Sequence, residues 1–167
     1  MYIQSLQEKL STDLVGAKAT SLSALFGYGF SVPNGYAVSK KVLEYYTKDN
    51  KLPVGFKQSL EDCLATLNSQ KIIIRSSAIG EDSESFSFAG QLDSFVVKNN
   101  MEDAIEAIQN CWNGLNNDRV IAYEKLSGKK LVEMGVIIQE FVEADYAGVT
   151  FTASPYNADQ IYTEYVK

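Results

Sequence analysis

Residues 71–97, KIIIRSSAIGEDSESFSFAGQLDSFVV, contain the pattern from which the rest of the chain is interpreted. The three isoleucines at 72–74 predict a buried strand, and the alternating residues 94–97 predict a second strand that returns beside it. Small and polar residues fill the long loop between these strands. Loops of this length are uncommon in compact domains unless they are functional or disordered. The stretch therefore predicts a hairpin that carries either a functional loop or an ordinary surface loop.

Arg75 stands near the end of the first predicted strand and supplies a charge suited to phosphate. Its guanidinium is planar and pairs with phosphate oxygens bidentately. Small side chains in the following loop would let backbone N–H groups approach the same phosphates. We therefore interpret the loop as a candidate lid over a polyphosphate, with a surface hairpin that binds nothing as the alternative.

A second candidate anion site lies near the N-terminus of the chain. Leu22, Leu25 and Phe26 recur at helical spacing after Gly16, and the two glycines that follow are expected to end the helix. Lys18 would lie near the start of this helix, where backbone N–H groups and the helix dipole favour anions. The alternative is an ordinary solvated lysine.

The remaining segments predict a scaffold of mixed helices and strands. Helices are expected at 39–46, 54–67, 100–115 and 116–123, and strands at 36–38, 134–142, 147–152 and 160–166. Trp112 lies on the apolar stripe of its helix, which favours a core role over stacking on adenine. Arg119 is interpreted as a structural residue.

Gln139 interrupts segment 134–142, which is otherwise typical of a central strand. A buried glutamine needs partners for its amide, and the edge of a nucleotide base at the end of the strand would provide them. The alternative is a glutamine that faces water from an edge strand.

Composition excludes several classes of protein. With 167 residues and 46% hydrophobic content, the chain is long and apolar enough to build a core. Its net charge of -6 argues against a nucleic-acid surface. No stretch is long enough to span a membrane, and the start lacks the apolar run of a signal peptide. The two cysteines, Cys63 and Cys111, favour reduced core thiols in a cytoplasmic protein over a disulfide.

Together these motifs resemble the N-terminal nucleotide-binding domain shared by phosphoenolpyruvate synthase, pyruvate phosphate dikinase and rifampicin phosphotransferase. The family patterns are close to V-G-G-K-x-x-S-L, R-S-S-A-x-x-E-D and S-F-A-G-Q-x-D-T. Three departures are Ala17 in place of the second glycine, Ser94 in place of the usual threonine and Ser154 in place of the usual aspartate. The matching segments lie at 15–18, 21–22, 75–78, 81–82, 88–91 and 93, with further resemblance at 118–123, 136–139 and 148–152.

The resemblance implies an α+β fold, the first part of an ATP-grasp-like domain. Residues 1–167 would form a partial ATP-binding domain, truncated or degenerate, with lobes at about 1–98 and 99–167. Lys18 and Arg75 would neutralise the phosphates of ATP, Gly90 would present a backbone N–H, Ser94 would offer a hydroxyl, and Gln139 would line the nucleotide pocket. Magnesium would be required, with its ligands outside this chain.

The implied parent protein is a phosphotransferase resembling phosphoenolpyruvate synthase. In such an enzyme ATP phosphorylates a histidine on another domain, and the phosphate passes to pyruvate. This sequence contains no histidine, so no catalytic residue is expected here, the chain alone is expected to be inactive, and a phosphohistidine domain is its expected partner. The alternatives are a rifampicin phosphotransferase, a pyruvate phosphate dikinase, or a non-catalytic nucleotide-binding module.

Overall fold

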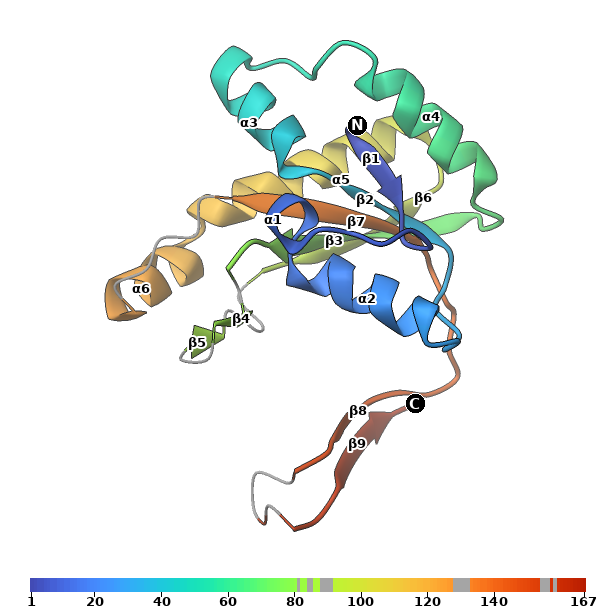
Figure 1. Ribbon diagram of the computed structural model, residues 1–167, viewed down its shortest axis with the longest axis vertical. Coiled ribbons are helices and arrows are strands. Elements are labelled where there is room, and N and C mark those ends of the chain that lie inside the picture. The colour runs from blue at the N-terminus through green and yellow to red at the C-terminus, as the bar shows by residue number, and fades with distance from the viewer. Residues whose placement is uncertain (81, 84–85, 88–91, 128–132, 154–156, 158) are drawn as a thin grey trace.

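A computed structural model describes residues 1–167 except 81, 84–85, 88–91, 128–132, 154–156 and 158. One five-stranded sheet carries helices on both of its faces, and a two-stranded hairpin lies apart from it (Figure 1). The predicted α+β class is confirmed. Within the described ranges, every helix is too short or too polar to cross a lipid bilayer.

The helices follow the predicted segments closely, with one short addition near the N-terminus. They are α1 (Thr12–Val15), α2 (Ala17–Gly27), α3 (Lys40–Asp49), α4 (Phe56–Thr66), α5 (Met101–Asn113), the 3-10 helix η1 (Gly114–Asn116) and α6 (Asp118–Ser127). The strands are β1 (Ile3–Ser5), β2 (Gly35–Val38), β3 (Lys71–Ala78), β4 (Asp82–Ser83), β5 (Phe86–Ser87), β6 (Ser94–Lys98), β7 (Met134–Glu140), β8 (Ala147–Phe151) and β9 (Tyr162–Val166).

The sheet is antiparallel throughout and has the order β1-β2-β7-β3-β6. β3 and β6 pair from Lys71 opposite Lys98 to Arg75 opposite Ser94, which confirms the predicted hairpin stem. β7 occupies the centre, as its apolar sequence predicts, and pairs with β2 and β3. The boundary between lobes near residue 98 stays a prediction, although strands from both sides of it share this one sheet.

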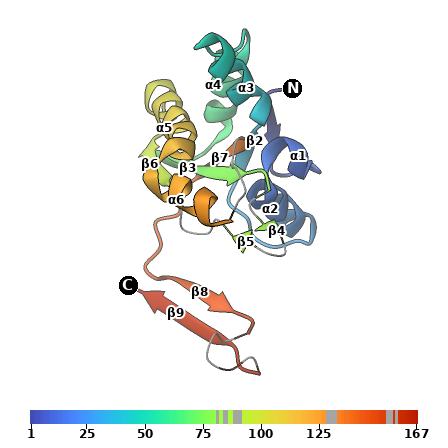
Figure 2. The same cartoon turned by 90° about the vertical axis from the view of Figure 1, so that its left-hand side faces the viewer.

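The face covered by α3, α4 and α5 holds the main apolar core (Figures 1 and 2). Phe56 of α4 is fully buried there, and Trp112 of α5 is only 4% exposed. The ring centroids of Trp112 and Tyr46 are 5.2 Å apart, so the predicted core role of Trp112 is confirmed. The buried sheet residues of this core are Ile3, Val38, Ile72, Ile74, Met134, Val136 and Ile138.

The opposite face is covered by α1 and α2, whose connection approaches the sheet very closely. Gly16 joins the two helices with φ +83°, and a Cβ built there would lie 2.2 Å from the carbonyl oxygen of Ser77. A Cβ on Gly135 of β7 would likewise lie 2.5 Å from the carbonyl oxygen of Val15. Glycine is therefore required at both positions, because any side chain would push the connection away from β3 and β7.

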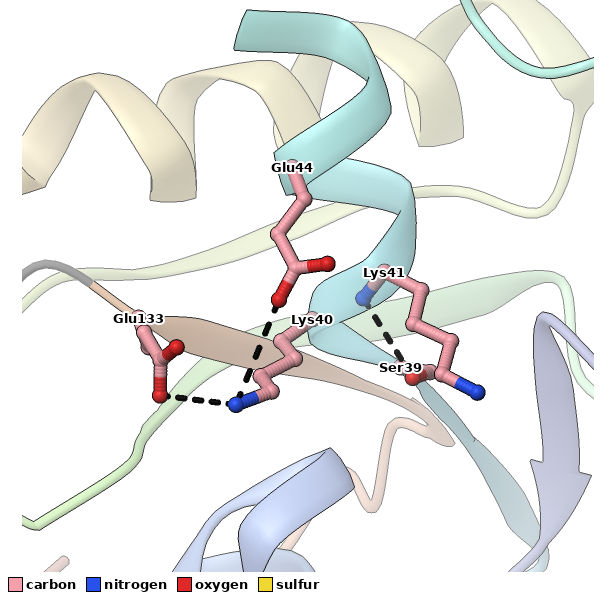
Figure 3. A network of polar contacts seen from close by, with 5 residues as sticks. All are labelled: Ser39, Lys40, Lys41, Glu44 and Glu133. Carbon is pink, nitrogen blue, oxygen red and sulfur yellow. Dashed lines mark hydrogen bonds and ion pairs between the residues drawn. The ribbon is translucent and has the colours of Figure 1, made fainter.

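An ion-pair network fixes the start of α3 beside the start of β7 (Figure 3). Lys40 Nζ lies 2.8 Å from Glu133 Oε2 and 4.0 Å from Glu44 Oε1. The hydrogen bond to Glu133, with the charges of Glu133 and Glu44, raises the pKa of Lys40 above its ordinary value. The backbone N–H of Ile79 donates to the carbonyl oxygen of Glu133, so the same residue holds the end of β3.

The hairpin of β8 and β9 carries the last described segments of the chain. Its strands pair from Ala147 opposite Val166 to Phe151 opposite Tyr162. A Cβ on Gly148 would lie 2.2 Å from the carbonyl oxygen of Glu164, so the two strands approach each other closely at this glycine. Both views place this hairpin away from the sheet, and side chains such as Val149 are exposed (Figures 1 and 2).

Candidate functional site

Three of the predicted site residues share one face of the sheet. Arg75 pairs with Ser94 of β6 on one side and with Ile137 of β7 on the other. Gln139 lies two positions beyond Ile137, and side chains two positions apart on a strand point to the same face. Ile137 packs in the cluster beneath α1 and α2, so Arg75, Ser94 and Gln139 belong to the face that these helices cover.

Lys18 reaches this region from α2. The close contact at Gly16 places the first turn of α2 against the end of β3, and Lys18 Nζ donates to the carbonyl oxygen of Ser76 at 2.9 Å. The backbone N–H of Ala19 donates to Ser77 Oγ at 3.1 Å. Two motifs 58 residues apart in sequence therefore meet at one point of the fold, beside Arg75.

Ala17, the departure from the family pattern, does not occupy the closest point of this contact. Gly16 is the residue whose Cβ would collide with Ser77, whereas Ala17 is the first residue of α2. The glycine that the geometry requires is therefore present. The methyl group of Ala17 leaves the contact between α2 and β3 intact.

Arg75 is half-buried, and its guanidinium makes no hydrogen bond or ion pair with the part of the chain that the structure describes. Ser94, directly opposite, is exposed and carries a hydroxyl. A half-buried guanidinium without a carboxylate partner is suited to binding an external anion, because charge-assisted hydrogen bonds are stronger in a partly desolvated site.

Gln139 is only 4% exposed and lies on the central strand. The alternative of an edge-strand glutamine facing water is therefore wrong. Its Nε2 donates to the carbonyl oxygen of Pro33 at 2.8 Å, so this donor is satisfied within the chain rather than by a base edge. Gly35 pairs with Gln139, and a Cβ there would lie 3.1 Å from the glutamine Cβ. A role for Gln139 in contacting nucleotide stays a prediction.

Gly90, the fifth predicted site residue, lies outside the described residues. The same is true of its neighbours at 88–91, so the predicted backbone contact at Gly90 stays a prediction. The described parts of the same loop form β4 and β5, in which Asp82 pairs with Ser87. Sequence patterns did not predict these two short strands.

The sequence did not predict the ion pair at the far end of this loop, although both of its residues lie within the family motifs. Arg119 Nη2 of α6 lies 2.6 Å from Oδ1 of Asp93, the residue that precedes β6. This contact agrees with the interpretation of Arg119 as a structural residue, which stays a prediction. The signal in the sequence was Asp93 itself, which corresponds to the aspartate of the S-F-A-G-Q-x-D-T pattern.

The thiols offer no nucleophile at neutral pH. Burial raises the pKa of Cys63 to about 11 and, as the main cause, also raises the pKa of Cys111 to about 11. Both cysteines are free and protonated near pH 7. The expectation of reduced thiols is confirmed for these two residues.

Metal-ligating side chains do not gather in the part of the chain described by the structure. No group of three or more His, Cys, Asp or Glu residues there could hold a metal ion. The described residues therefore provide cations for an anionic ligand but no protein cage for magnesium.

Comparisons with known proteins agree with this geometry. A family model described as "Pyruvate phosphate dikinase, AMP/ATP-binding domain" matches residues 53–166. The uncharacterized phosphotransferase YvkC of Bacillus subtilis is 27% identical over 173 residues, covering 92% of this chain and 21% of that protein. This alignment extends well beyond residues 53–166, the part that the family model matches and that does not include Lys18.

Two further relatives carry more specific descriptions. A probable phosphoenolpyruvate synthase of Methanothermobacter thermautotrophicus is 40% identical over 86 residues, or 50% of this chain and 13% of that protein. A rifampicin phosphotransferase of Streptomyces is 35% identical over 89 residues, or 52% of this chain and 10% of that protein. The chain thus spans a fifth or less of the length of these two relatives. The family match covers more than half of the sequence, and the chain belongs to the family of pyruvate phosphate dikinase AMP/ATP-binding domains.

Proposed function

We propose that this chain is the ATP-binding portion of a phosphotransferase resembling phosphoenolpyruvate synthase. In the parent protein, ATP would phosphorylate a histidine on another domain, and the phosphate would pass to pyruvate. The site lies at the end of β3 that faces α2. Residues 1–167 would act as a partial ATP-binding domain of a cytoplasmic enzyme.

The observation that carries the proposal is the meeting of two cations at one end of β3. The Lys18 ammonium is anchored on the carbonyl oxygen of Ser76, next to Arg75, whose guanidinium faces the same side of the sheet as α2. Two cations and a helix N-terminus form an arrangement suited to polyphosphate.

Each residue would have a defined part in binding. Lys18 and Arg75 would neutralise the phosphates, Ser94 would donate its hydroxyl, and Gly90 would present its backbone N–H. Gln139 would line the nucleotide pocket, for which its bond to Pro33 leaves the amide oxygen as the available group. Positioning and electrostatics are what phosphoryl transfer requires from a protein. Magnesium would neutralise further charge on the phosphates, with its protein ligands outside this chain.

The acceptor of the phosphate has to come from elsewhere, because the sequence contains no histidine. A phosphohistidine domain of the parent enzyme is the proposed partner, and this chain alone would not complete a phosphoryl transfer. Rifampicin phosphotransferase activity is the second candidate, favoured by the similarity to a relative of that description. Both candidates require the same ATP site.

Calorimetric titration with ATP, with and without magnesium, tests the proposal. Lys18→Met removes the ammonium but keeps most of the aliphatic side chain, and Lys9→Met removes an exposed lysine of the same segment as a matched control. Loss of a charge-assisted contact should cost about 1.5–3 kcal/mol, or roughly tenfold or more in affinity. The control should bind like the original chain. A folded chain that binds no ATP under either condition would contradict the proposal.

A further inference from the structure

A continuous set of hydrogen bonds links the surface of α6 to the candidate nucleotide site. Arg119 Nη2 contacts Asp93 Oδ1 at 2.6 Å. The carbonyl oxygen of Asp93 accepts a hydrogen bond from Ser76 Oγ at 3.2 Å. The carbonyl oxygen of Ser76 in turn accepts from Lys18 Nζ at 2.9 Å. Helix α6, strand β3, helix α2 and the segment that precedes β6 are therefore linked through Asp93 and the buried Ser76.

Ser76 couples the position of Asp93 to that of Lys18, because it contacts both residues. It is 1% exposed and follows Arg75 directly. Its side chain holds Asp93, and its backbone carbonyl holds Lys18. The bond to Asp93 also extends the pairing of β3 with β6 beyond its last register pair, Arg75 opposite Ser94. A shift of Asp93 would therefore displace Ser76 and, through the Ser76 carbonyl group, the ammonium of Lys18.

The ion pair between Arg119 and Asp93 contributes little to global stability. The side chains are 53% and 45% exposed, and ion pairs in such positions are weakened by solvent and salt. Its location is more informative than its strength. It fixes the backbone directly before Ser94, where the loop returns to the sheet and where the phosphates of ATP would lie.

We infer that Arg119 and Asp93 are positioning residues of the nucleotide site, which hold Ser76 so that Lys18 and Arg75 face the phosphates together. This inference rests on the proposed function. Arg119 would have a second effect through charge, because its loss would leave the Asp93 carboxylate unpaired beside an anionic ligand. Neither residue needs to touch ATP in this arrangement.

The test is ATP titration calorimetry on the full chain with variants of the pair. Arg119→Gln and Asp93→Asn each break the ion pair, and Arg119→Lys keeps the charge and a donor. The matched control is the pair between Lys71 and Glu143, which is 54% and 69% exposed and lies at the other end of β3. Lys71→Gln and Glu143→Gln break that pair with the same change of chemistry.

We expect Arg119→Gln and Asp93→Asn each to weaken ATP binding by about three- to tenfold, as is typical of residues that act on a site through a packed network. Arg119→Lys should recover most of the affinity. The double variant should bind no more weakly than either single variant, because both break one interaction. Lys71→Gln and Glu143→Gln should change the affinity by less than about twofold.

A second readout is independent of ligand. Amide hydrogen exchange over residues 76–79, measured without nucleotide, should be faster in Arg119→Gln than in the original chain and unchanged in Lys71→Gln. The inference is overturned, and the proposed function kept, if Arg119→Gln binds ATP normally while Lys18→Met is weakened. If the variants of both ion pairs lose the same ATP affinity, the cause is general destabilisation, and the inference is likewise overturned. A chain without ATP binding overturns both proposals.

Discussion

The two faces of the central sheet are built for different purposes, although they share the same strands. On the face beneath α3, α4 and α5, β3 contributes Ile72 and Ile74 to a continuous apolar core. On the opposite face the same strand contributes Arg75 and Ser77, and α2 approaches it through Gly16. One face therefore holds the main apolar core, and the other combines a smaller buried cluster with charges and backbone groups at close range. Substitutions on the core face should change stability alone, whereas those on the opposite face should also change ligand binding.

Phe56→Ala should have the largest effect, and it should act on stability alone. Phe56 is fully buried in the core face, and truncation of a buried phenylalanine costs about 3–5 kcal/mol through lost burial and the cavity left behind. Urea denaturation measures this loss. Val54→Ala is the control, because Val54 is 93% exposed and should change the free energy of unfolding by less than about 0.5 kcal/mol. A loss below about 1 kcal/mol for Phe56→Ala would place the core elsewhere.

Gly16→Ala should affect both stability and ATP binding. The new methyl group would lie 2.2 Å from the Ser77 carbonyl oxygen at a residue with φ +83°, so strain and collision should together cost about 2–4 kcal/mol. Lys18 would be displaced with the helix. Gly29→Ala provides the control, because Gly29 also has φ +83° but nothing within 4 Å.

The Gly29 variant should lose about 1–2 kcal/mol from backbone strain alone and bind ATP normally. Thermal unfolding and ATP titration of both variants measure the difference. Equal losses of stability and unchanged ATP affinity in both variants would show that the contact between Gly16 and Ser77 does not position the site.

Asn100→Ala should have a smaller effect, confined to the core face. Asn100 Oδ1 accepts from the backbone N–H of Asp103 at 2.9 Å and caps α5. Loss of such a cap costs about 1 kcal/mol, and Asn100→Ser should restore most of it because serine is also a good cap. Urea denaturation of both variants tests this expectation. Identical stability of the two variants would argue against the capping role.

The smallest effect near neutral pH is expected from the thiols. The pKa of Cys63 and that of Cys111 are each raised to about 11, mainly by burial, from an ordinary value of 9.0. Folded protein therefore favours the protonated thiol, so this contribution to stability is present below pH 9 and is lost as pH rises through about 11.

Alkylation with iodoacetamide at pH 7.5 should accordingly be much slower in the folded chain than in urea. Cys111 should react more slowly than Cys63, because it is buried while Cys63 is partly exposed. Alkylation of folded Cys111 at the rate of the unfolded chain would contradict the burial of α5 against the sheet.

Much of the fold could be predicted because hydrophobic periodicity acts locally. The isoleucines of β3, the alternation of β6 and the stripe of α5 each determine an element within a few residues. The four-residue helix α1 was not predicted, since one turn is too short to show a period. The order of strands was not predicted either, because pairing of β2 with β7 joins residues about 100 positions apart and depends on tertiary packing.

The sequence predicts which residues belong to the site but not which contacts these residues make. The motifs drew attention to Lys18 and Arg75, yet the anchor of Lys18 on the Ser76 carbonyl depends on how α2 lies on β3. The partner of Gln139 is the carbonyl of Pro33, a backbone group that no pattern of side chains in the sequence predicts. Backbone acceptors are equally available at every residue, so only the fold selects one of them.

The most direct test of the account is to map ATP onto the two faces by NMR. In a titration of the isotopically labelled chain, ATP should shift the backbone amides of Lys18, Arg75, Ser76 and Ser94, which surround the α2 end of β3. Amides of α3, α4 and α5, the helices that cover the core face, should stay in place. A lysine-bearing hollow lies there between α3, α4 and α5, lined by residues that include Lys51, Lys57 and Gln109. Shifts confined to that hollow would contradict the assignment of the nucleotide site to the face covered by α1 and α2.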